Sequence, residues 1–294
     1  MQEHLHNCKI QALPSFSAKE VNADILRLDL LHPVVSGNKW FKLRYYLEDA
    51  LVNHKKTIAT FGGAYSNHIV ATAHAAKEAG LASIGFIRGE RAALLSSTLA
   101  HAEDLGMRLV FTDRETYRQK EKIIAENSGH DYYWIMEGGY GAAGARGAAT
   151  ILDGVDIKSY THIICAVGTG TMLAGLIKGA LPHHQVIGIS VLRNHFGLAD
   201  DVGRLLDTNG PQPLILHDYH FGGYAKHPPE LLDFMRQTWG LEKLPTDIVY
   251  TSKMLFAVKQ LITGGYFPKD SNLLLIHSGG LQGNHSLPPG TLPF

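Results

Sequence analysis

The sequence predicts an α/β protein with mostly parallel sheets, divided into two units. From residue 57 onward, short apolar runs alternate with segments of helical periodicity. Strands that alternate with helices form parallel sheets joined by crossover helices. A turn-rich stretch over 138–154 separates two such series. The length of 294 residues allows two domains at about 150 residues each.

The first series has strands that are apolar runs of five or six residues. The first of its helices ends near Gly80, and Gly106 follows the second, as is typical of a helix C-terminus. A segment rich in glycine and alanine, 138–149, follows this series. The expected elements are strand 57–61, helix 66–80, strand 82–87, helix 94–105, strand 107–112, helix 115–126 and strand 132–136.

The second series repeats the alternation toward the C-terminus. The expected elements are strand 162–167, helix 172–180, strand 186–191, helix 198–206, strand 213–217, helices 230–239 and 252–263, and strand 273–277. We therefore interpret residues 48–159 as one unit and 160–294 as a second. Residues 1–47 are compatible with either unit.

Composition and charge exclude several classes of protein. The 27 Lys and Arg residues equal the 27 Asp and Glu residues, so no basic surplus is present for a nucleic-acid backbone. No apolar stretch approaches the ~20 residues that span a bilayer. Residues 1–10 are polar and unlike a signal peptide, so we expect a cytoplasmic protein. The pairs His4/His6 and His183/His184 lack Cys, Asp or Glu in ligand spacing, and no metal site is predicted.

A lysine lies at the start of a predicted helix near residue 38. From Trp40 the apolar positions 40, 43, 47, 50 and 51 share one helix face, and Asn38 suits an N-cap. Lys39 then lies in the first turn, at the positive end of the helix dipole, with Lys42 one turn further. Both neighbours disfavour a protonated amine, and a lysine of lowered pKa suits Schiff-base chemistry. The same pattern is also typical of a surface lysine that opens a helix.

Two glycine-containing turns lead from a strand into a helix. In the segment 61–68, two glycines precede Ser66 and Asn67, and free backbone N–H groups there could bind a carboxylate or phosphate. An ordinary connection with Ser66 as helix cap is the alternative. The segment 167–175 has the place of a phosphate cradle, with a plain turn as the alternative. Leu173 replaces the third glycine of a dinucleotide fingerprint, so a smaller phosphorylated cofactor is indicated.

Aromatic and hydroxyl residues near the C-terminus complete the candidate set. Tyr250 precedes a predicted helix, Tyr224 follows two glycines, and Ser278 ends a strand. A tyrosine can stack on a planar cofactor, although core or surface packing is its commoner role.

The combination resembles the pyridoxal-phosphate (PLP) enzymes of the tryptophan-synthase β-like fold, fold type II. Within that fold it resembles the family of 1-aminocyclopropane-1-carboxylate (ACC) deaminase and D-cysteine desulfhydrase, over about residues 28–283. The matching motifs are Gly37-Asn38-Lys39, Ser66-Asn67-His68, Gly168 to Thr171, Tyr224, Tyr250 and His277 to Gly280. The resemblance implies three-layer αβα units with mostly parallel sheets. It also implies a large PLP-binding domain of residues 1–47 and 160–294, with a small inserted domain of residues 48–159.

The resemblance implies a role for each matching residue. Lys39 corresponds to the lysine that bonds to the cofactor, Asn67 to the asparagine beside its 3′-oxygen, and Tyr250 to the tyrosine stacked on its ring. The implied cofactor-binding residues are Lys39, Asn67, Gly168, Thr169, Gly170, Thr171, Tyr250 and Thr251. The implied substrate-binding residues are Ser66, Asn67, His68 and Ser278, and the implied catalytic residues are Lys39, Ser66, Tyr224 and Tyr250.

Two positions distinguish the branches of the family. ACC deaminases resemble one another in a glutamate after the stacking tyrosine and a leucine before the two glycines, where this chain has Thr251 and Ser278. A glutamate keeps the pyridine nitrogen protonated and strengthens the electron sink, whereas a hydroxyl does so much less. Loss of a good leaving group such as thiolate requires a weaker electron sink than the opening of the cyclopropane ring of ACC. Both hydroxyl residues and His68 are similar to the D-cysteine desulfhydrase branch.

The resemblance thus implies a PLP-dependent lyase or deaminase acting on a small amino acid. D-Cysteine desulfhydrase is the favoured activity, with pyruvate, ammonia and sulfide as products. The alternatives are ACC deaminase, a D-serine-type dehydratase or racemase, and a PLP or amino-acid binding protein without turnover. The complete set of Lys39, Ser66, Asn67 and Tyr250 argues against the last. A homodimer is expected because relatives in this family tend to form one.

Overall fold

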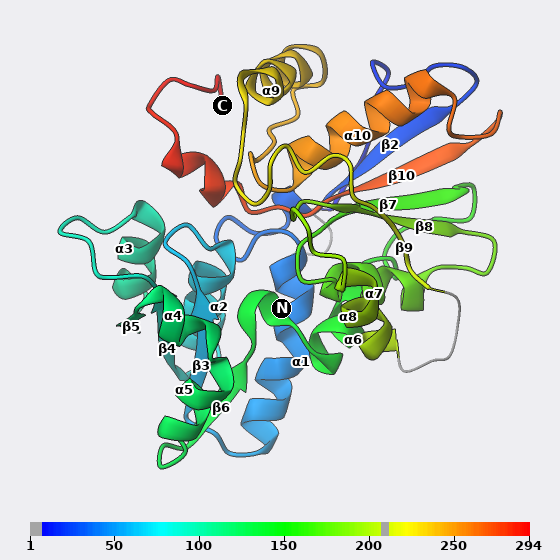
Figure 1. Ribbon diagram of the computed structural model, residues 1–294. Coiled ribbons are helices and arrows are strands. Elements are labelled where there is room, and N and C mark those ends of the chain that lie inside the picture. The colour runs from blue at the N-terminus through cyan, green and yellow to red at the C-terminus, as the bar shows by residue number, and fades with distance from the viewer. Residues whose placement is uncertain (1–7, 207–211) are drawn as a thin grey trace.

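The computed structural model describes residues 8–206 and 212–294, which form two sheets surrounded by helices (Figure 1). His4 and His6 therefore lie outside the described residues. Strands and helices alternate along most of the chain, and all strand pairs but one are parallel. The prediction of an α/β protein with mostly parallel sheets is confirmed.

The larger sheet has six strands in the order β1-β2-β10-β7-β8-β9, of which only β1 is antiparallel to its neighbour. Its strands are β1 Ile10–Ala12, β2 Asn22–Arg27, β7 His162–Val167, β8 Gln185–Ser190, β9 Leu214–Leu216 and β10 Asn272–His277. The sequence did not predict β1 or β2. Since β1 pairs with β2 and β2 with β10, residues 10–12 and 22–27 join a sheet whose other four strands follow residue 160. The division into two domains stays a prediction.

The smaller sheet has four parallel strands in the order β5-β4-β3-β6. Its strands are β3 Thr57–Gly62, β4 Ala82–Arg88, β5 Met107–Thr112 and β6 Tyr132–Ile135. Because all four run the same way, their carboxyl ends meet at one edge of the sheet, where α/β proteins commonly bind ligands.

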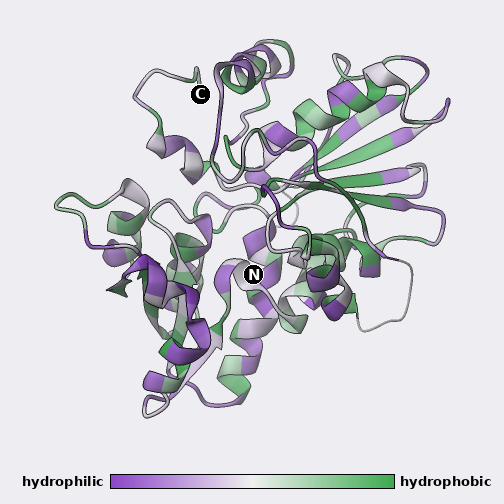
Figure 2. Cartoon of the chain, in the orientation of Figure 1, coloured by the Kyte–Doolittle hydropathy of each residue, from purple (hydrophilic) through white to green (hydrophobic). Residues whose placement is uncertain are grey.

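Helices cover both faces of each sheet (Figure 1). The helices are α1 Asn38–Val52, α2 Asn67–Glu78, α3 Ser97–Asp104, α4 Arg114–Arg118, α5 Lys120–Glu126, α6 Ala142–Ala149, α7 Thr171–Gly179, α8 Leu198–Leu206, α9 Pro229–Glu242 and α10 Thr251–Gly264. Strand β7 is buried throughout, and alternate residues enter two cores. Ile163 and Cys165 pack with α1 and α7, while Ile164 and Ala166 pack with α10. Figure 2 accordingly shows the larger sheet mostly in green.

Two local predictions were wrong in detail. Gly37, with φ 65°, caps α1 in place of Asn38, which is the first helical residue. A Cβ on Gly37 would lie 1.8 Å from the Ser278 carbonyl oxygen, so only glycine allows this close approach. The expected helix 115–126 is two helices, α4 and α5, because Gln119 leaves helical geometry with ψ 60°.

The described residues were compared with the requirements of a membrane-spanning helix and of a metal site. Across residues 8–206 and 212–294, no helix combines the length and apolar character needed to cross a membrane. Within the same residues, no three or more His, Cys, Asp or Glu side chains gather as a metal-ligating group.

Candidate active site

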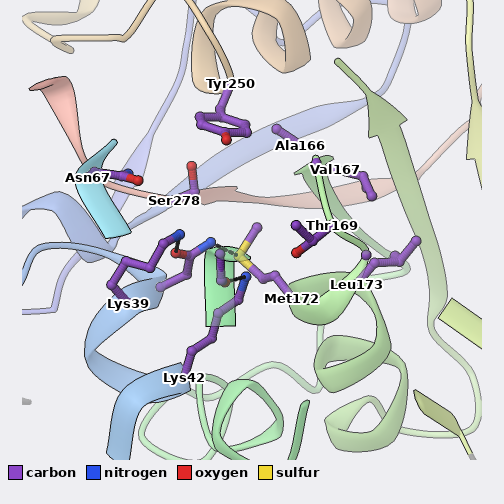
Figure 3. Close-up of a pocket in the computed structure, with 14 residues that line it drawn as sticks. Lys39, Lys42, Asn67, Ala166, Val167, Thr169, Met172, Leu173, Tyr250 and Ser278 are labelled. Atoms are coloured by element: carbon purple, nitrogen blue, oxygen red, sulfur yellow. Dashed lines mark hydrogen bonds between the residues drawn. The ribbon is translucent and has the colours of Figure 1, made fainter. Parts of the chain in front are cut away.

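Two adjoining cavities lie where the starts of α1, α2 and α7 approach one another. We call the larger, of about 900 Å³, the outer cleft, and the narrower one beneath it the inner pocket. Figure 3 shows the inner pocket, with Lys39 and Lys42 on α1 at one side and Tyr250 at the other. The residues that line both cavities are Lys39, Asn67, Gly138, Gly168, Thr169 and Tyr250.

Lys39 is a buried amine, with 6% of the residue exposed. Its Nζ donates a hydrogen bond to Asn38 Oδ1 at 2.8 Å. Burial lowers the pKa of Lys39 to about 8, and the charge of Asp247 opposes this only in part. The main cause is removal of the amine from water, and not the helix dipole or Lys42 expected from the sequence. A fraction of this amine is uncharged near neutral pH and able to attack a carbonyl carbon.

Lys42 is a second buried amine that the sequence analysis did not include among the site residues. Its Nζ lies 3.4 Å from the Gly138 carbonyl oxygen. Burial, and then the charge of Lys39, lower the pKa of Lys42 well below its usual value. Among the described residues, no carboxylate forms an ion pair with Lys39 or Lys42. In the sequence, the signal for Lys42 is its position three residues after Lys39, which places both side chains on one face of the helix. The inner pocket is therefore suited to an anion.

The loop before α7 is shaped by glycines. Gly170 caps α7 with φ 83°, and a Cβ on it would lie 2.6 Å from Val202 Cγ2. A Cβ on Gly168 would lie 3.2 Å from Tyr250 Cε1. Side chains at either position would intrude on a neighbour, so the backbone itself forms this wall of the pocket.

Backbone amides at the start of α7 are available to an anion. The first amide bonded back along this helix is that of Ala174, which donates to the Gly170 carbonyl at 2.9 Å. The amides before it have no partner within the helix. The hydroxyls of Thr169 and Thr171 lie 3.1 Å apart, and Thr169 lines both cavities while Thr171 lines neither. Together with the helix dipole, these groups favour a phosphate.

Ser66 and Asn67 open α2 at the floor of the outer cleft. Ser66 is the N-cap by position, yet its side chain makes no capping hydrogen bond. Its hydroxyl thus stays available at a helix start, as an anion site requires. Asn67 lines both cavities and packs closely on Gly280, where a Cβ would lie 1.9 Å from Asn67 Nδ2.

His68 is a buried neutral imidazole on the cleft wall. Thr60 Oγ1 donates its one proton to the Ile135 carbonyl at 2.7 Å and so accepts from His68 Nε2 at 2.8 Å. His68 Nδ1 is then unprotonated, and it has no hydrogen-bond partner within the described chain. Burial, and then the charges of Lys39 and Lys42, lower the pKa of His68 well below its usual value. The wall of the cleft therefore contains a buried, unpaired acceptor at His68 Nδ1.

Asp247 fixes the position of Tyr250. Its two carboxylate oxygens accept from the backbone N–H groups of Val249, Tyr250 and Thr251 at 2.8–2.9 Å. Tyr224 meets the Tyr250 ring edge-on, with centroids 6.1 Å apart, and 46% of Tyr224 is exposed. These contacts hold the Tyr250 ring against both cavities.

Lys253 holds the loop that carries Tyr224. This fully buried lysine donates hydrogen bonds from Nζ to the carbonyls of His220 at 3.0 Å and Gly223 at 2.7 Å. Burial lowers the pKa of Lys253 to about 8. Lys253 was not among the predicted site residues, because nothing in its sequence context marks a contact with a loop thirty residues away.

The two hydroxyl residues used to distinguish the branches differ in position. Ser278 lines the inner pocket, and its buried Oγ has no hydrogen-bond partner in the described part of the chain. Thr251 is fully buried and lines neither cavity, so its contact with a cofactor stays a prediction. Within residues 8–206 and 212–294, no aspartate or glutamate lines the inner pocket.

The structure brings ten of the twelve predicted site residues to the two cavities. Those that line the outer cleft are Lys39, Ser66, Asn67, His68, Gly168, Thr169, Tyr224 and Tyr250, while Gly170 and Ser278 line the inner pocket only. Their individual roles stay predictions. The sequence analysis missed charged residues of the outer cleft, namely Arg88, Arg114, Lys120, Glu137, Asp201 and Arg204.

Comparison with known proteins agrees with this geometry. The family described as "Pyridoxal-phosphate dependent enzyme" matches residues 2–279. A Thermotoga maritima protein described as "Putative 1-aminocyclopropane-1-carboxylate deaminase" is 31% identical, over 93% of this chain and 94% of its own length. A Pyrococcus horikoshii protein of the same description is 29% identical, over 93% and 89%. A crystal structure described as that of an ACC deaminase homologue has a TM-score of 0.82 and 27% identity, and covers 95% of this chain and 90% of its own.

The family match includes every residue that lines the inner pocket, and the matched relatives cover nearly the whole chain. The predicted fold type is thereby confirmed, as is PLP as the cofactor of the family. The chain belongs to the family of pyridoxal-phosphate-dependent enzymes that includes these ACC deaminase-like proteins.

Proposed function

We propose that the chain is a PLP-dependent lyase for a small amino acid, with D-cysteine as the favoured substrate. In the net reaction, D-cysteine and water give pyruvate, ammonia and hydrogen sulfide. The Cβ–S bond breaks, the sulfur leaves with the electron pair, and water finally replaces the nitrogen.

The inner pocket fits PLP. Lys39 would supply the amine for its aldehyde carbon, and Lys42 with the loop 168–171 would hold its phosphate. The Tyr250 ring would cover its ring, with Asn67 beside it. When bound, PLP supplies an electron sink for negative charge at the substrate α-carbon.

The other groups of the site would position the substrate and move its protons. Ser66 and the amides at the start of α2 would bind the α-carboxylate. Lys39, whose pKa is lowered to about 8, would remove the α-proton as an uncharged amine. His68 and Tyr224 line the outer cleft and would form its wall beside the substrate.

The observation that carries the choice of D-cysteine is that no described residue of the inner-pocket lining has a carboxylate. A neutral hydroxyl, that of Ser278, is the unpartnered polar group there. Without a carboxylate, a pyridine nitrogen is protonated less and the electron sink is weaker. Loss of a thiolate requires a weaker electron sink than the opening of a cyclopropane ring does. The inner pocket is therefore better suited to D-cysteine than to ACC.

ACC deaminase is the second candidate. The 31% identical relative carries that description, and it covers 93% of this chain. The two activities give different products, because ring opening of ACC yields 2-oxobutanoate. We also keep a homodimer as a proposal, which sedimentation of the purified protein tests.

The test measures both products with the purified, PLP-loaded protein. We expect kcat/KM for D-cysteine to exceed that for ACC by about 100-fold, a difference of about 3 kcal/mol in activation free energy. Ser278→Ala should lower kcat for D-cysteine, whereas Ser83→Ala, at an equally buried serine in β4 outside both cavities, is the matched control. Comparable efficiency with ACC would overturn the choice of substrate.

A further inference from the structure

The outer cleft carries more positive charge than the proposed reaction uses. Its lining has five basic side chains and two carboxylates, in a chain whose formal net charge is zero. The basic residues are Lys39, Arg88, Arg114, Lys120 and Arg204, and the acidic residues are Glu137 and Asp201. An excess of one sign in a cleft attracts ligands of the other sign.

Two of the cations are already neutralised by neighbours. Lys120 Nζ lies 3.0 Å from Glu137 Oε2, and Arg204 Nη1 lies 2.8 Å from Asp201 Oδ1. Lys39 is assigned to the cofactor.

Arg88 and Arg114 are the cations that remain. Within residues 8–206 and 212–294, neither forms an ion pair or a hydrogen bond with another side chain. Two guanidinium groups without a carboxylate therefore face one cleft.

The position of Arg88 relates it to the substrate. Arg88 ends β4, and its Nη2 lies 3.5 Å from the point where a Cβ on Gly63 would stand. Gly63 belongs to the turn that leads to Ser66, the proposed site of the α-carboxylate. The Tyr117 ring supports the guanidinium, whose Cζ lies 5.9 Å from the ring centroid.

Arg114 follows the neighbouring strand β5 and lines the same cleft. In the register of β4 and β5, Arg88 lies beside Thr112, two residues before Arg114. Both arginines thus leave the carboxyl edge of the smaller sheet, beyond the turn that opens α2. Arg114 is exposed at the start of α4, where its guanidinium is free to turn toward a ligand.

We propose that Arg88 and Arg114 form a second anion subsite for the far end of the substrate. The cleft would then take β-thio amino acids whose sulfur bears a further anionic group, in addition to D-cysteine itself. For S-carboxymethyl-D-cysteine and water, the products are pyruvate, ammonia and mercaptoacetate, with the sulfur leaving with the Cβ–S electron pair. This inference rests on the proposed function, because Lys39 and Ser66 orient the other end of the substrate. Guanidinium groups suit this role because they bind carboxylates in two-point contacts.

The test compares two substrates that differ by one carboxylate, S-carboxymethyl-D-cysteine and S-methyl-D-cysteine. We expect the holoenzyme to favour the anionic substrate by about tenfold or more in kcat/KM, as charge-assisted hydrogen bonds allow. Arg88→Met and Arg114→Met should each reduce that ratio toward one. Arg118→Met is the control, since Arg118 is exposed at the end of α4 and does not line the cleft. A wild-type ratio near one, or a ratio that Arg88→Met leaves unchanged, would overturn the proposal.

A binding measurement separates this inference from the proposed reaction. D-Aspartate and D-alanine also differ by one carboxylate, and both can be titrated into the holoenzyme by the change in visible absorbance. Tighter binding of D-aspartate that is lost in Arg88→Met would support the subsite even if no substrate released pyruvate. Pyruvate release from S-methyl-D-cysteine with equal binding of the two probes would support the lyase and refute the subsite.

Discussion

Replacement of Lys39 by methionine tests the burial of its amine through the stability of the cofactor-free protein. Burial lowers the pKa of Lys39 from 10.5 to about 8. Since one pKa unit corresponds to about 1.4 kcal/mol, a protonated Lys39 destabilises the fold by about 3 kcal/mol at pH 7. The variant loses the hydrogen bond to Asn38, about 1 kcal/mol. We therefore expect Lys39→Met to stabilise the protein by about 2 kcal/mol at pH 7.

The effect depends on pH in a defined direction. The folded pKa lies below the unfolded one, so the penalty is full below about pH 8 and disappears as pH rises toward 10.5. The difference between variant and wild type should then shift by about 2 kcal/mol, against the variant, between pH 7 and pH 10. The charge of Lys39 also lowers the pKa of Lys42. Lys39→Met removes that charge, which further increases the stability of the variant at pH 7.

Urea unfolding at both pH values measures these differences. Lys122→Met is the control, because that side chain is 59% exposed and its removal relieves no burial. A Lys39→Met protein that is less stable than wild type at pH 7, or whose difference is the same at both pH values, would refute the reasoning.

Two further predictions concern the packing around the site. Gly280→Ala should weaken PLP affinity in a titration, because its Cβ would lie 1.9 Å from Asn67 Nδ2. Gly290→Ala is the control for backbone strain alone, because Gly290 also has a positive φ but its Cβ would have no neighbour within 4 Å. Asp247→Asn should lower the free energy of unfolding by about 2 kcal/mol in urea, because an amide cannot accept from all three backbone N–H groups. Asp113→Asn, which alters an exposed cap, should cost less than half as much.

Equal losses of PLP affinity in Gly280→Ala and Gly290→Ala would show that strain, and not contact with Asn67, is responsible. A loss in Asp247→Asn no larger than in Asp113→Asn would show that the buried carboxylate does not stabilise the start of α10.

The buried strands could be predicted from the sequence because both of their faces are covered. Strands such as β7 and β10 are continuous apolar runs, as parallel strands buried on both faces are. Strand β2 was missed because it is short in apolar residues, with Asn22 and Arg27 at its ends and Asp24 within it. Its place depends on pairing with β10, some 250 residues away, which no local pattern records.

The site could be predicted where its residues are adjacent in sequence. Lys39 and the loop 168–171 each belong to a short motif, and the structure places both at the inner pocket. Arg88 and Arg114 could not be predicted, because a charged residue just after a strand is ordinary on a surface. They converge only because β4 and β5 are parallel neighbours whose carboxyl ends meet at one edge. Lys42 was visible in the sequence, but its burial was not.

We propose that Lys39 and a PLP cofactor in the inner pocket catalyse β-elimination. The most direct test is the rate of pyruvate release from D-cysteine by the PLP-loaded protein, beside the Lys39→Ala variant saturated with PLP. We expect rapid release from the wild type and loss of at least about 1,000-fold in the variant, as removal of a catalytic group typically causes. Full turnover by Lys39→Ala, or no pyruvate from a wild-type protein that holds PLP, would contradict the account.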